Sequence, residues 1–461
     1  MQRVVQEMND LLHRGLDAHV RIAVTGLSRA GKTAFITSVV NQLLYTSTHD
    51  ALPLFEAARE QRILGAKRMP QTNMLVPRFT YDDAMQQLYA DPPQWPQPTR
   101  DVSEIRLAIK YRSRRRSKKW LNRISTLYLD LIDYPGEWLL DLPLLEMDFA
   151  EWSQHQFAAL TGQRKVLAQS WLAALDELDL SAEVDEKQLE EVAHAYTDYL
   201  HQCKAHGLHW VQPGRFVLPG ELAGAPVLQF FPVRLDAQAE PRRFAASSQY
   251  AMLKARYQEY QQKVVKAFYK QHFATFDRQI VLVDCLSPLN AGEEAFLDMR
   301  QALEQLMRSF KYGRNNLLQR LFAPKIDKIL FAATKADHVT PEQHPNLVSL
   351  LQQMVQPTWQ QAAYDNIEMN CVSLASVQAT QAGFIPRGDT SLPALQGTTL
   401  AGESLTLFPG EVPKKLPSAA FWHEQGFAFQ AFRPMPSSVD EPLRHIRMDK
   451  VLDLLIGDKL Q

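Results

Sequence analysis

The sequence predicts an α/β protein with a mostly parallel sheet, one antiparallel edge strand and an inserted all-helical domain. Short β-branched runs alternate with helical patterns toward both ends of the chain, at residues 20–45 and 279–374. The stretch between them, residues 139–275, carries mostly helical apolar stripes. A glycine-rich loop, GLSRAGKT at 26–33, lies where the first strand meets a helix, which is the context of a phosphate-binding loop.

The composition is that of a globular protein. Its 461 residues are 46% apolar, and 50 basic side chains balance 51 acidic ones to a formal charge of −1. This balance gives no global basis for nucleic-acid binding, so no nucleic acid is expected as a partner. The chain lacks an apolar run of the roughly 18 residues that span a bilayer, and its N-terminal segment is too charged for a signal peptide. We therefore expect a cytoplasmic protein.

Each expected element follows from the spacing of its apolar residues. The proline-rich residues 46–100 are expected to form a long surface loop, and residues 213–233 a short strand or packed loop. The hairpin that contains residues 104–133 supplies the antiparallel edge strand. Strands are expected at 20–25, 104–111, 126–133, 279–285, 328–333 and 367–374, and helices at 2–17, 32–45, 293–310, around Leu350 and at 440–456.

These patterns divide the chain into four parts. A discontinuous P-loop domain is expected at residues 1–138 and 276–379, and the helical insertion at 139–275. Residues 380–436, with many prolines and glycines, are expected to form a loop-rich subdomain. Residues 437–461 are expected to form a C-terminal helix that packs on the P-loop domain.

The most informative motif, G-x-x-x-x-G-K-[ST], runs from Gly26 to Thr33. Its glycines let backbone N–H groups turn around a phosphate, and the following helix N-terminus favours negative charge. Lys32 would reach the β- and γ-phosphate oxygens, and Thr33 would give its hydroxyl to Mg²⁺. Arg29 is either a charge stabiliser or a solvent-facing side chain. The residues expected to hold the nucleotide phosphates are Ser28, Arg29, Ala30, Gly31, Lys32, Thr33 and Ala34.

A carboxylate near the metal is expected at the end of a neighbouring strand. Asp133 to Gly136 has the form D-x-x-G and follows the predicted strand TLYLDLI. Asp133 would hold a magnesium-bound water, and the Gly136 N–H would sense a γ-phosphate; the alternative is a simple strand-ending turn. A hydroxyl that coordinates Mg²⁺ is expected before this strand, from Thr99 or from its rival Ser103, although Thr99 alternatively caps a turn.

A base-reading motif is expected at the end of the strand KILFAA. The motif Thr334-Lys335-Ala336-Asp337 follows that strand directly. The Asp337 carboxylate can accept hydrogen bonds from N1–H and N2–H₂ of guanine but would repel the N1 acceptor of adenine, while the Lys335 stem can lie over the ring. Backbone amides near Ala375 and Ser376 would contact the guanine O6.

The order of these motifs resembles that of the translation-factor-like and Ras-like P-loop GTPases. More closely, the chain resembles the bacterial YcjX-like family. The matching stretches are AVTGLSRAGKTAF at 23–35, W-P-x-x-T at 95–99, LIDYPGEWLLDLPLL at 131–145, PGRFVLPGEL at 213–222 and HIRMDKVLDLLIGDKL at 445–460. The resemblance implies a Ras-like GTPase that binds GTP and GDP with Mg²⁺ and carries a large helical insertion. It also implies a link to envelope stress of the phage-shock type, and it leaves the protein partner of the insertion unknown.

Glu137 departs from the general GTPase pattern, in which Gln often follows D-x-x-G. A carboxylate there orients an attacking water differently and repels a γ-phosphate, so slow GTP turnover is expected. The expected catalytic residues are Lys32, Thr99, Gly136 and Glu137.

Two other functions fit part of the pattern. An ATPase or small-molecule kinase would explain the glycine loop alone, and a nucleotide-binding scaffold with negligible turnover would fit Glu137. The run Arg112–Lys119 has six cations in eight residues. It is either a solvated hairpin tip or a contact with anionic lipid headgroups, which would place the protein peripherally at the inner membrane.

Overall fold

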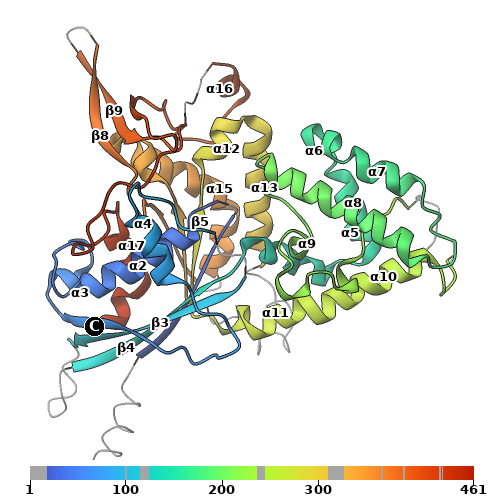
Figure 1. The fold of residues 1–461 in the computed structure, drawn as a ribbon, viewed down its shortest axis with the longest axis horizontal. Helices are drawn as coiled ribbons and strands as arrows, with labels where there is room; N and C mark the ends of the chain where they lie inside the picture. Colours follow the sequence, from blue (N-terminus) through green and yellow to red (C-terminus); the bar gives the residue numbers. More distant parts are fainter. Residues whose placement is uncertain are drawn as a thin grey trace, which may run out of the picture. The chain divides into compact units, whose positions relative to one another are not determined.

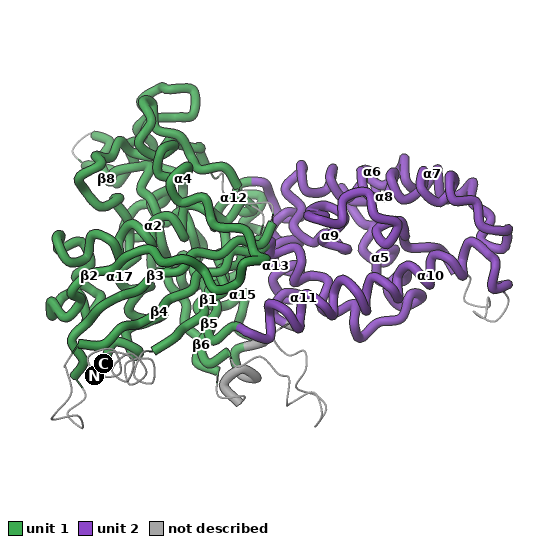
Figure 2. Tube along the Cα trace, turned by 60° about the horizontal axis from the view of Figure 1, so that its bottom comes forward, with its two compact units in different colours: residues 1–134, 276–290, 325–461 green, residues 135–275, 291–324 purple. Residues whose placement is uncertain are grey.

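The computed structural model describes residues 18–27, 29–98, 101–114, 124–235, 244–309, 326–364, 367–387, 390–424, 427 and 429–461. The expected helix at 2–17, the candidate residues Ser28 and Thr99, and residues 115–119 of the basic run lie outside these ranges. The chain divides into two compact units, which Figure 2 colours separately. Unit 1 comprises residues 1–134, 276–290 and 325–461, and unit 2 comprises residues 135–275 and 291–324.

Unit 1 is built on a seven-stranded sheet in the order β2-β3-β4-β1-β5-β6-β7. Figure 1 labels β3, β4 and β5 of this sheet. β4, β1, β5, β6 and β7 run parallel, β3 pairs antiparallel with β4, and β2 pairs antiparallel with β3. The strands are β1 Ala18–Gly26, β2 Ile63–Met69, β3 Ser103–Arg112, β4 Ile124–Asp133, β5 Arg278–Val283, β6 Lys328–Ala333 and β7 Glu368–Ser373. The predicted α/β class with a mostly parallel sheet is confirmed.

The expectation that residues 46–100 form a long surface loop is wrong, because the segment contains two helices and a strand. It contains α3 (Glu56–Arg59), β2 and α4 (Tyr81–Leu88). β2 covers β3, so β2, not the predicted hairpin, forms the edge of the sheet. A strand is predicted from the sequence by the alternation of apolar and polar side chains. The strand ILGAKRM is half-exposed and carries a register shift at Gly65, so it lacks this alternation.

Alternate side chains of the central strands build a core on one face of the sheet. This core joins Ile22 and Val24 of β1 and Leu282 of β5 to buried residues of α2 (Lys32–Tyr45) and α17 (Met448–Ile456). The remaining helices of unit 1 are α12 Leu286–Ala291, α15 His344–Tyr364, which packs on β6 and β7, and α16 Ala419–Glu424, with short 3₁₀ turns at Ala336–His338, Pro341–Gln343 and Gly457–Leu460. α17 begins eight residues later than predicted.

Residues 380–436 hold a second sheet that the expectation of loops misses. Its three antiparallel strands, in the order β10-β9-β8, are β8 Thr380–Arg387, β9 Thr390–Thr398 and β10 Ser404–Leu407. Pro386 and Pro393 stand inside β8 and β9, where prolines argue against a strand assignment.

The described residues of unit 2 form helices joined by turns and irregular segments. Its elements are the 3₁₀ helix η1 Gly136–Glu146, α5 Phe149–Ala158, α6 Gly162–Leu167, α7 Gln169–Asp176, α8 Glu186–Ala205, α9 Gly214–Val217, the turns Gly220–Leu222, Pro226–Leu228 and Phe273–Thr275, α10 Gln249–Glu259, the π-helix η5 Tyr260–Val265, α11 Lys266–Gln271 and α13 Glu293–Ser309. Its core is aromatic: Trp152 stacks on Tyr257 at 5.2 Å and contacts Phe230 edge-on at 5.4 Å. Across all described residues, each helix is too short or too polar to span a bilayer.

Candidate functional site

The glycine loop joins the end of β1 to the first residue of α2. Gly31 adopts the left-handed conformation (φ 83°, ψ 30°), which glycine accepts without steric cost. The Ala30 N–H donates to Leu27 O at 3.1 Å, so the loop turns tightly before α2 begins at Lys32. The first N–H groups of a helix have no partner within the helix, and together with the helix dipole they favour an anion at this end.

Gly26 is required by the packing of β1 against β5. A Cβ at this position would lie 2.6 Å from Leu282 O, closer than side chains approach backbone atoms. The half-buried Lys32 folds back so that its Nζ lies 3.4 Å from Gly26 O. The loop therefore carries an ammonium group beside the N-terminus of α2, as a phosphate-binding loop requires.

The T-K-A-D segment begins directly after β6. Asp337 is 4% exposed; its Oδ2 accepts the Ala379 N–H at 2.7 Å, and its Oδ1 lies 3.1 Å from His338 Nδ1. Burial raises the pKa of Asp337, but the adjoining His338 and the backbone N–H outweigh burial and lower the pKa below its usual value. The carboxylate is therefore ionised at neutral pH.

The two motifs meet at one cavity of about 570 Å³ in unit 1, a size typical of small-ligand sites. The sequence-predicted residues that line it are Arg29, Ala30, Gly31, Lys32, Thr33, Ala34, Lys335, Asp337, Ala375 and Ser376. The cavity lies at the carboxyl ends of parallel strands, where ligands bind in open α/β sheets. The structure thus brings together the predicted phosphate contacts and base contacts, which lie about 300 positions apart.

Sequence reasoning missed much of the cavity wall. Trp95, Pro96 and Pro98 line it, and the sequence analysis uses them only as part of the W-P-x-x-T stretch that supports the family resemblance. Phe429 and Phe432 also line it, and the Trp95 indole N–H donates to Phe432 O at 2.7 Å. Thr334, the first residue of the predicted T-K-A-D motif, lines the cavity as well. The other lining residues are Ser287 and Asn290 of α12, and His338, Val377, Leu400, Gln430 and Ala431. These residues belong to no motif that the sequence analysis identifies.

Asp133, the predicted metal carboxylate, is the last residue of β4 and is 1% exposed. It is in register with Val24 of β1, two residues before Gly26, so it lies at the same end of the sheet as the glycine loop. It is not among the residues that line the cavity. Ser103, the rival of Thr99, pairs with Asp133 across the antiparallel ladder.

Gly136 and Glu137 belong to unit 2, where they begin η1. Glu137 is 4% exposed and its Oε1 lies 2.8 Å from Lys204 Nζ on α8. A Cβ on Gly214 would lie 2.1 Å from Glu137 O, so a glycine is required beside this segment. The segment after D-x-x-G is therefore held within the helical unit by an ion pair and close backbone packing.

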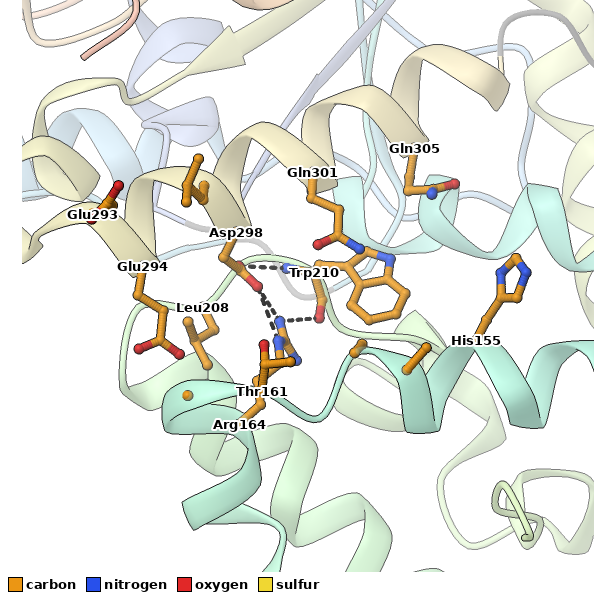
Figure 3. A pocket seen from close by; sticks show the side chains of 14 residues that line it. His155, Thr161, Arg164, Leu208, Trp210, Glu293, Glu294, Asp298, Gln301 and Gln305 are labelled. Atoms are coloured by element: carbon orange, nitrogen blue, oxygen red, sulfur yellow. Dashed lines mark hydrogen bonds and ion pairs between the residues drawn. The ribbon is translucent and has the colours of Figure 1, made fainter. Parts of the chain in front are cut away.

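Unit 2 contains a second cavity of about 780 Å³ (Figure 3). Arg164 and Asp298 form a buried ion pair in its wall, and an Arg164 N–H donates to Trp210 O at 2.6 Å. Figure 3 shows these three side chains converging between α6 and α13. This cavity contains none of the sequence-predicted site residues.

The sheet order, the glycine loop and the helix that follows it define a P-loop nucleotide-binding fold. The comparison with known proteins agrees. The model of the YcjX-like family, DUF463, matches residues 20–460, and the chain belongs to this family. It is 56% identical to a protein of Escherichia coli named Ras-like GTPase YcjX, over the whole of both chains. It is 45% identical to a protein of the same name from Shewanella oneidensis, over 100% of this chain and 99% of that one.

Proposed function

We propose that this protein binds guanine nucleotides in the unit 1 cavity and hydrolyses GTP slowly to GDP and phosphate. One observation carries the proposal: the glycine loop, Asp337 and Ala375–Ser376 line the same cavity. The names of the two relatives support it, since both are called Ras-like GTPases.

The phosphate end would use the backbone more than side chains. The N–H groups at the start of α2 would surround the β-phosphate, and Lys32 would neutralise charge on the β- and γ-phosphates. Arg29, which is exposed and in the left-handed region (φ 63°), lines the same end of the cavity. It would add a second positive charge in the same chain.

The base end would use the ionised Asp337. An ionised carboxylate has about four acceptor positions on its two oxygens, and Ala379 and His338 take one on each. The remaining lone pairs would accept N1–H and N2–H₂ of guanine. Because Asp337 is buried, adenine would leave these remaining lone pairs unsatisfied and facing another acceptor, which is the kind of mismatch that gives strong selectivity.

Mg²⁺ fits the donors that this end of the sheet offers. It prefers oxygen ligands and is usually bound through one or two protein groups together with substrate phosphates and waters. The Thr33 hydroxyl would be one ligand and the Asp133 carboxylate would hold the ion through water, while the third candidate, Thr99, lies outside the described residues. When bound, Mg²⁺ supplies charge neutralisation at the phosphates.

Slow turnover would follow from Glu137. Gly136 and Glu137 continue the D-x-x-G segment into unit 2. A conformational change at Asp133 when GDP replaces GTP would therefore be transmitted along η1 to the helical unit and its unidentified protein partner. The buried ion pair of Glu137 with Lys204 also favours a second candidate, a nucleotide-binding scaffold with negligible turnover. Phosphate release from GTP under single-turnover conditions separates the two, with Thr99→Ala as the variant that should abolish release if hydrolysis occurs.

The cellular setting is proposed on the family resemblance and on charge. We place the protein in the cytoplasm in an envelope stress response, with peripheral contact at the inner membrane through Arg112–Lys119. Within the described part of this run, Arg114 pairs with Glu56 and Glu60, so the lipid contact would depend on the other cations. Sedimentation with anionic vesicles, compared with neutral vesicles, tests this contact.

Isothermal titration calorimetry of the nucleotide-free protein tests the function. GDP and GTP should bind with micromolar or tighter affinity, ATP should bind weakly, and Lys32→Ala should abolish binding. Asp337→Asn should move the preference from guanine toward xanthine nucleotides, because the amide then faces an acceptor. A preference for ATP would refute the base assignment and favour an ATPase or a small-molecule kinase.

A further inference from the structure

Asp284 is a buried carboxylate beside the cavity that the preceding argument does not use. It follows β5 directly, and Lys335 comes two residues after β6, the next parallel strand. Val283 and Ala333 are in register, and the Thr334 N–H donates to Val283 O at 2.9 Å. The carboxyl ends of the two strands therefore place Asp284 and Lys335 side by side, although 51 positions separate them in the sequence.

The two side chains form a close ion pair. Lys335 Nζ lies 2.5 Å from Asp284 Oδ2 and 3.3 Å from Ser287 Oγ. The Lys335 backbone is left-handed (φ 59°, ψ 35°), a conformation that is sterically unfavourable for a residue with a Cβ. A residue in such a conformation persists when its surroundings hold it there. The ion pair is one of the contacts that fix the direction of this side chain.

Asp284 is itself immobilised from several sides. Its Oδ1 accepts the N–H groups of Leu286 at 3.1 Å and Ser287 at 3.0 Å, and its Oδ2 accepts the Ser287 hydroxyl at 2.6 Å. Burial raises the pKa of Asp284, but Lys335 and the hydrogen bonds from Ser287 outweigh burial and lower the pKa. A charged, fixed carboxylate thus anchors the ammonium end of Lys335.

The anchored lysine forms part of the cavity wall. Lys335 lines the cavity together with Ser287 and Asn290 of α12, and Ser287 also donates to Asp284. With its ammonium group tied to Asp284, the four-carbon stem is left as a fixed apolar surface, and lysine stems cover apolar surfaces well. A flat aromatic base needs such a surface beside the edge-reading Asp337.

We propose that Asp284 is a positioning residue that holds the Lys335 stem against the nucleotide base. This inference rests on the proposed function and adds a residue to its base subsite. Asp284 acts through Lys335 and does not itself contact the nucleotide. A purely structural role, as the cap of the short helix α12, is the competing explanation, because Leu286 and Ser287 donate to the same carboxylate.

A double-mutant cycle on GDP affinity distinguishes these roles. Asp284→Asn keeps an oxygen for the backbone N–H groups but removes the charge that holds Lys335. In the otherwise wild-type chain it should weaken GDP binding about tenfold, whereas in a Lys335→Met background it should change affinity less than twofold. Asp148→Asn is the matched control, since Asp148 caps α5 in unit 2 through Ala150 and Glu151, and it should leave GDP affinity unchanged.

Competition with inorganic triphosphate supplies a second readout. This ligand has no base, so Asp284→Asn should leave its affinity unchanged if the phosphate end is intact. Equal loss of GDP affinity with and without Lys335, or no loss at all, would overturn the positioning role and leave the proposed function standing. A parallel loss of triphosphate affinity would overturn it in favour of a structural role. Absence of GDP binding by the wild-type protein would overturn both.

Discussion

Replacing Gly26 by alanine tests how the sheet shapes the glycine loop. Gly26 ends β1 and is in register with Leu282 of β5. A Cβ there would lie 2.6 Å from Leu282 O, 3.0 Å from Leu282 Cβ and 3.1 Å from Ala30 Cβ. Ordinary van der Waals contact begins at 3.4 Å, so the added Cβ would lie about 0.8 Å too close to Leu282 O. Because the obstructing atom belongs to the backbone of a central strand, β1 and β5 must move apart.

The expected cost is that of overpacking a core, about 1–3 kcal/mol. For a unit of this size, about 2 kcal/mol corresponds to a fall in melting temperature of roughly 3 °C. Far-ultraviolet circular dichroism on heating measures this fall. GDP affinity should fall as well, because the displaced strand end carries the loop.

Gly383→Ala is the matched control. Gly383 lies in β8 of the same unit, and a Cβ there meets no atom within 4 Å. Alanine should be neutral or stabilise by about 0.4–1 kcal/mol, because it restricts the unfolded chain. If both variants melt together with the wild type, the close packing of β1 on β5 does not require glycine and the reasoning fails.

Three further predictions concern unit 2. Burial raises the pKa of Asp141 to about 7, so between pH 3.8 and 7 the folded state keeps a proton that the unfolded chain has released. The free energy of unfolding should therefore fall by on the order of 4 kcal/mol as pH rises through this range. Asp141→Asn should flatten this pH dependence in melting curves, and an unchanged slope would refute the prediction. Asp298→Ala should destabilise unit 2 by about 3–5 kcal/mol in denaturant titrations, because it leaves Arg164 buried without its carboxylate. A fall in the free energy of unfolding of less than about 1 kcal/mol would contradict a buried ion pair. Glu137→Gln should destabilise unit 2 by about 1–3 kcal/mol in denaturant titrations, because the amide lacks the charge that pairs with Lys204; unchanged stability would contradict a contribution from this ion pair.

The sequence predicted the parts of the candidate site that consist of consecutive residues. Gly26 to Thr33 specifies a strand end, a turn and a helix start within eight positions, and Thr334 to Asp337 follows a buried strand directly. Local backbone chemistry determines both, so a single sequence suffices. The same reasoning found the parallel strands, whose apolar runs are continuous because helices cover both faces.

The parts that the sequence did not predict depend on contacts between distant positions. The pair Asp284–Lys335 and the hydrogen bond from Trp95 to Phe432 exist only because the fold brings separate segments together. β2 was missed for a different reason: as a half-exposed edge strand with a register shift, it lacks the alternation that identifies a strand. The prolines of β8 and β9 hid the second sheet in the same way.

The central claim is that the unit 1 cavity holds a guanine nucleotide by its phosphates and its base. A crystal structure of the protein with GDP and Mg²⁺ tests it most directly. The account predicts a diphosphate within hydrogen-bonding distance of the main-chain amides that flank Gly31, and a guanine ring between the Lys335 stem and the Asp337 carboxylate. Density for GDP elsewhere, or a cavity closed by the protein's own chain at saturating GDP, would contradict it.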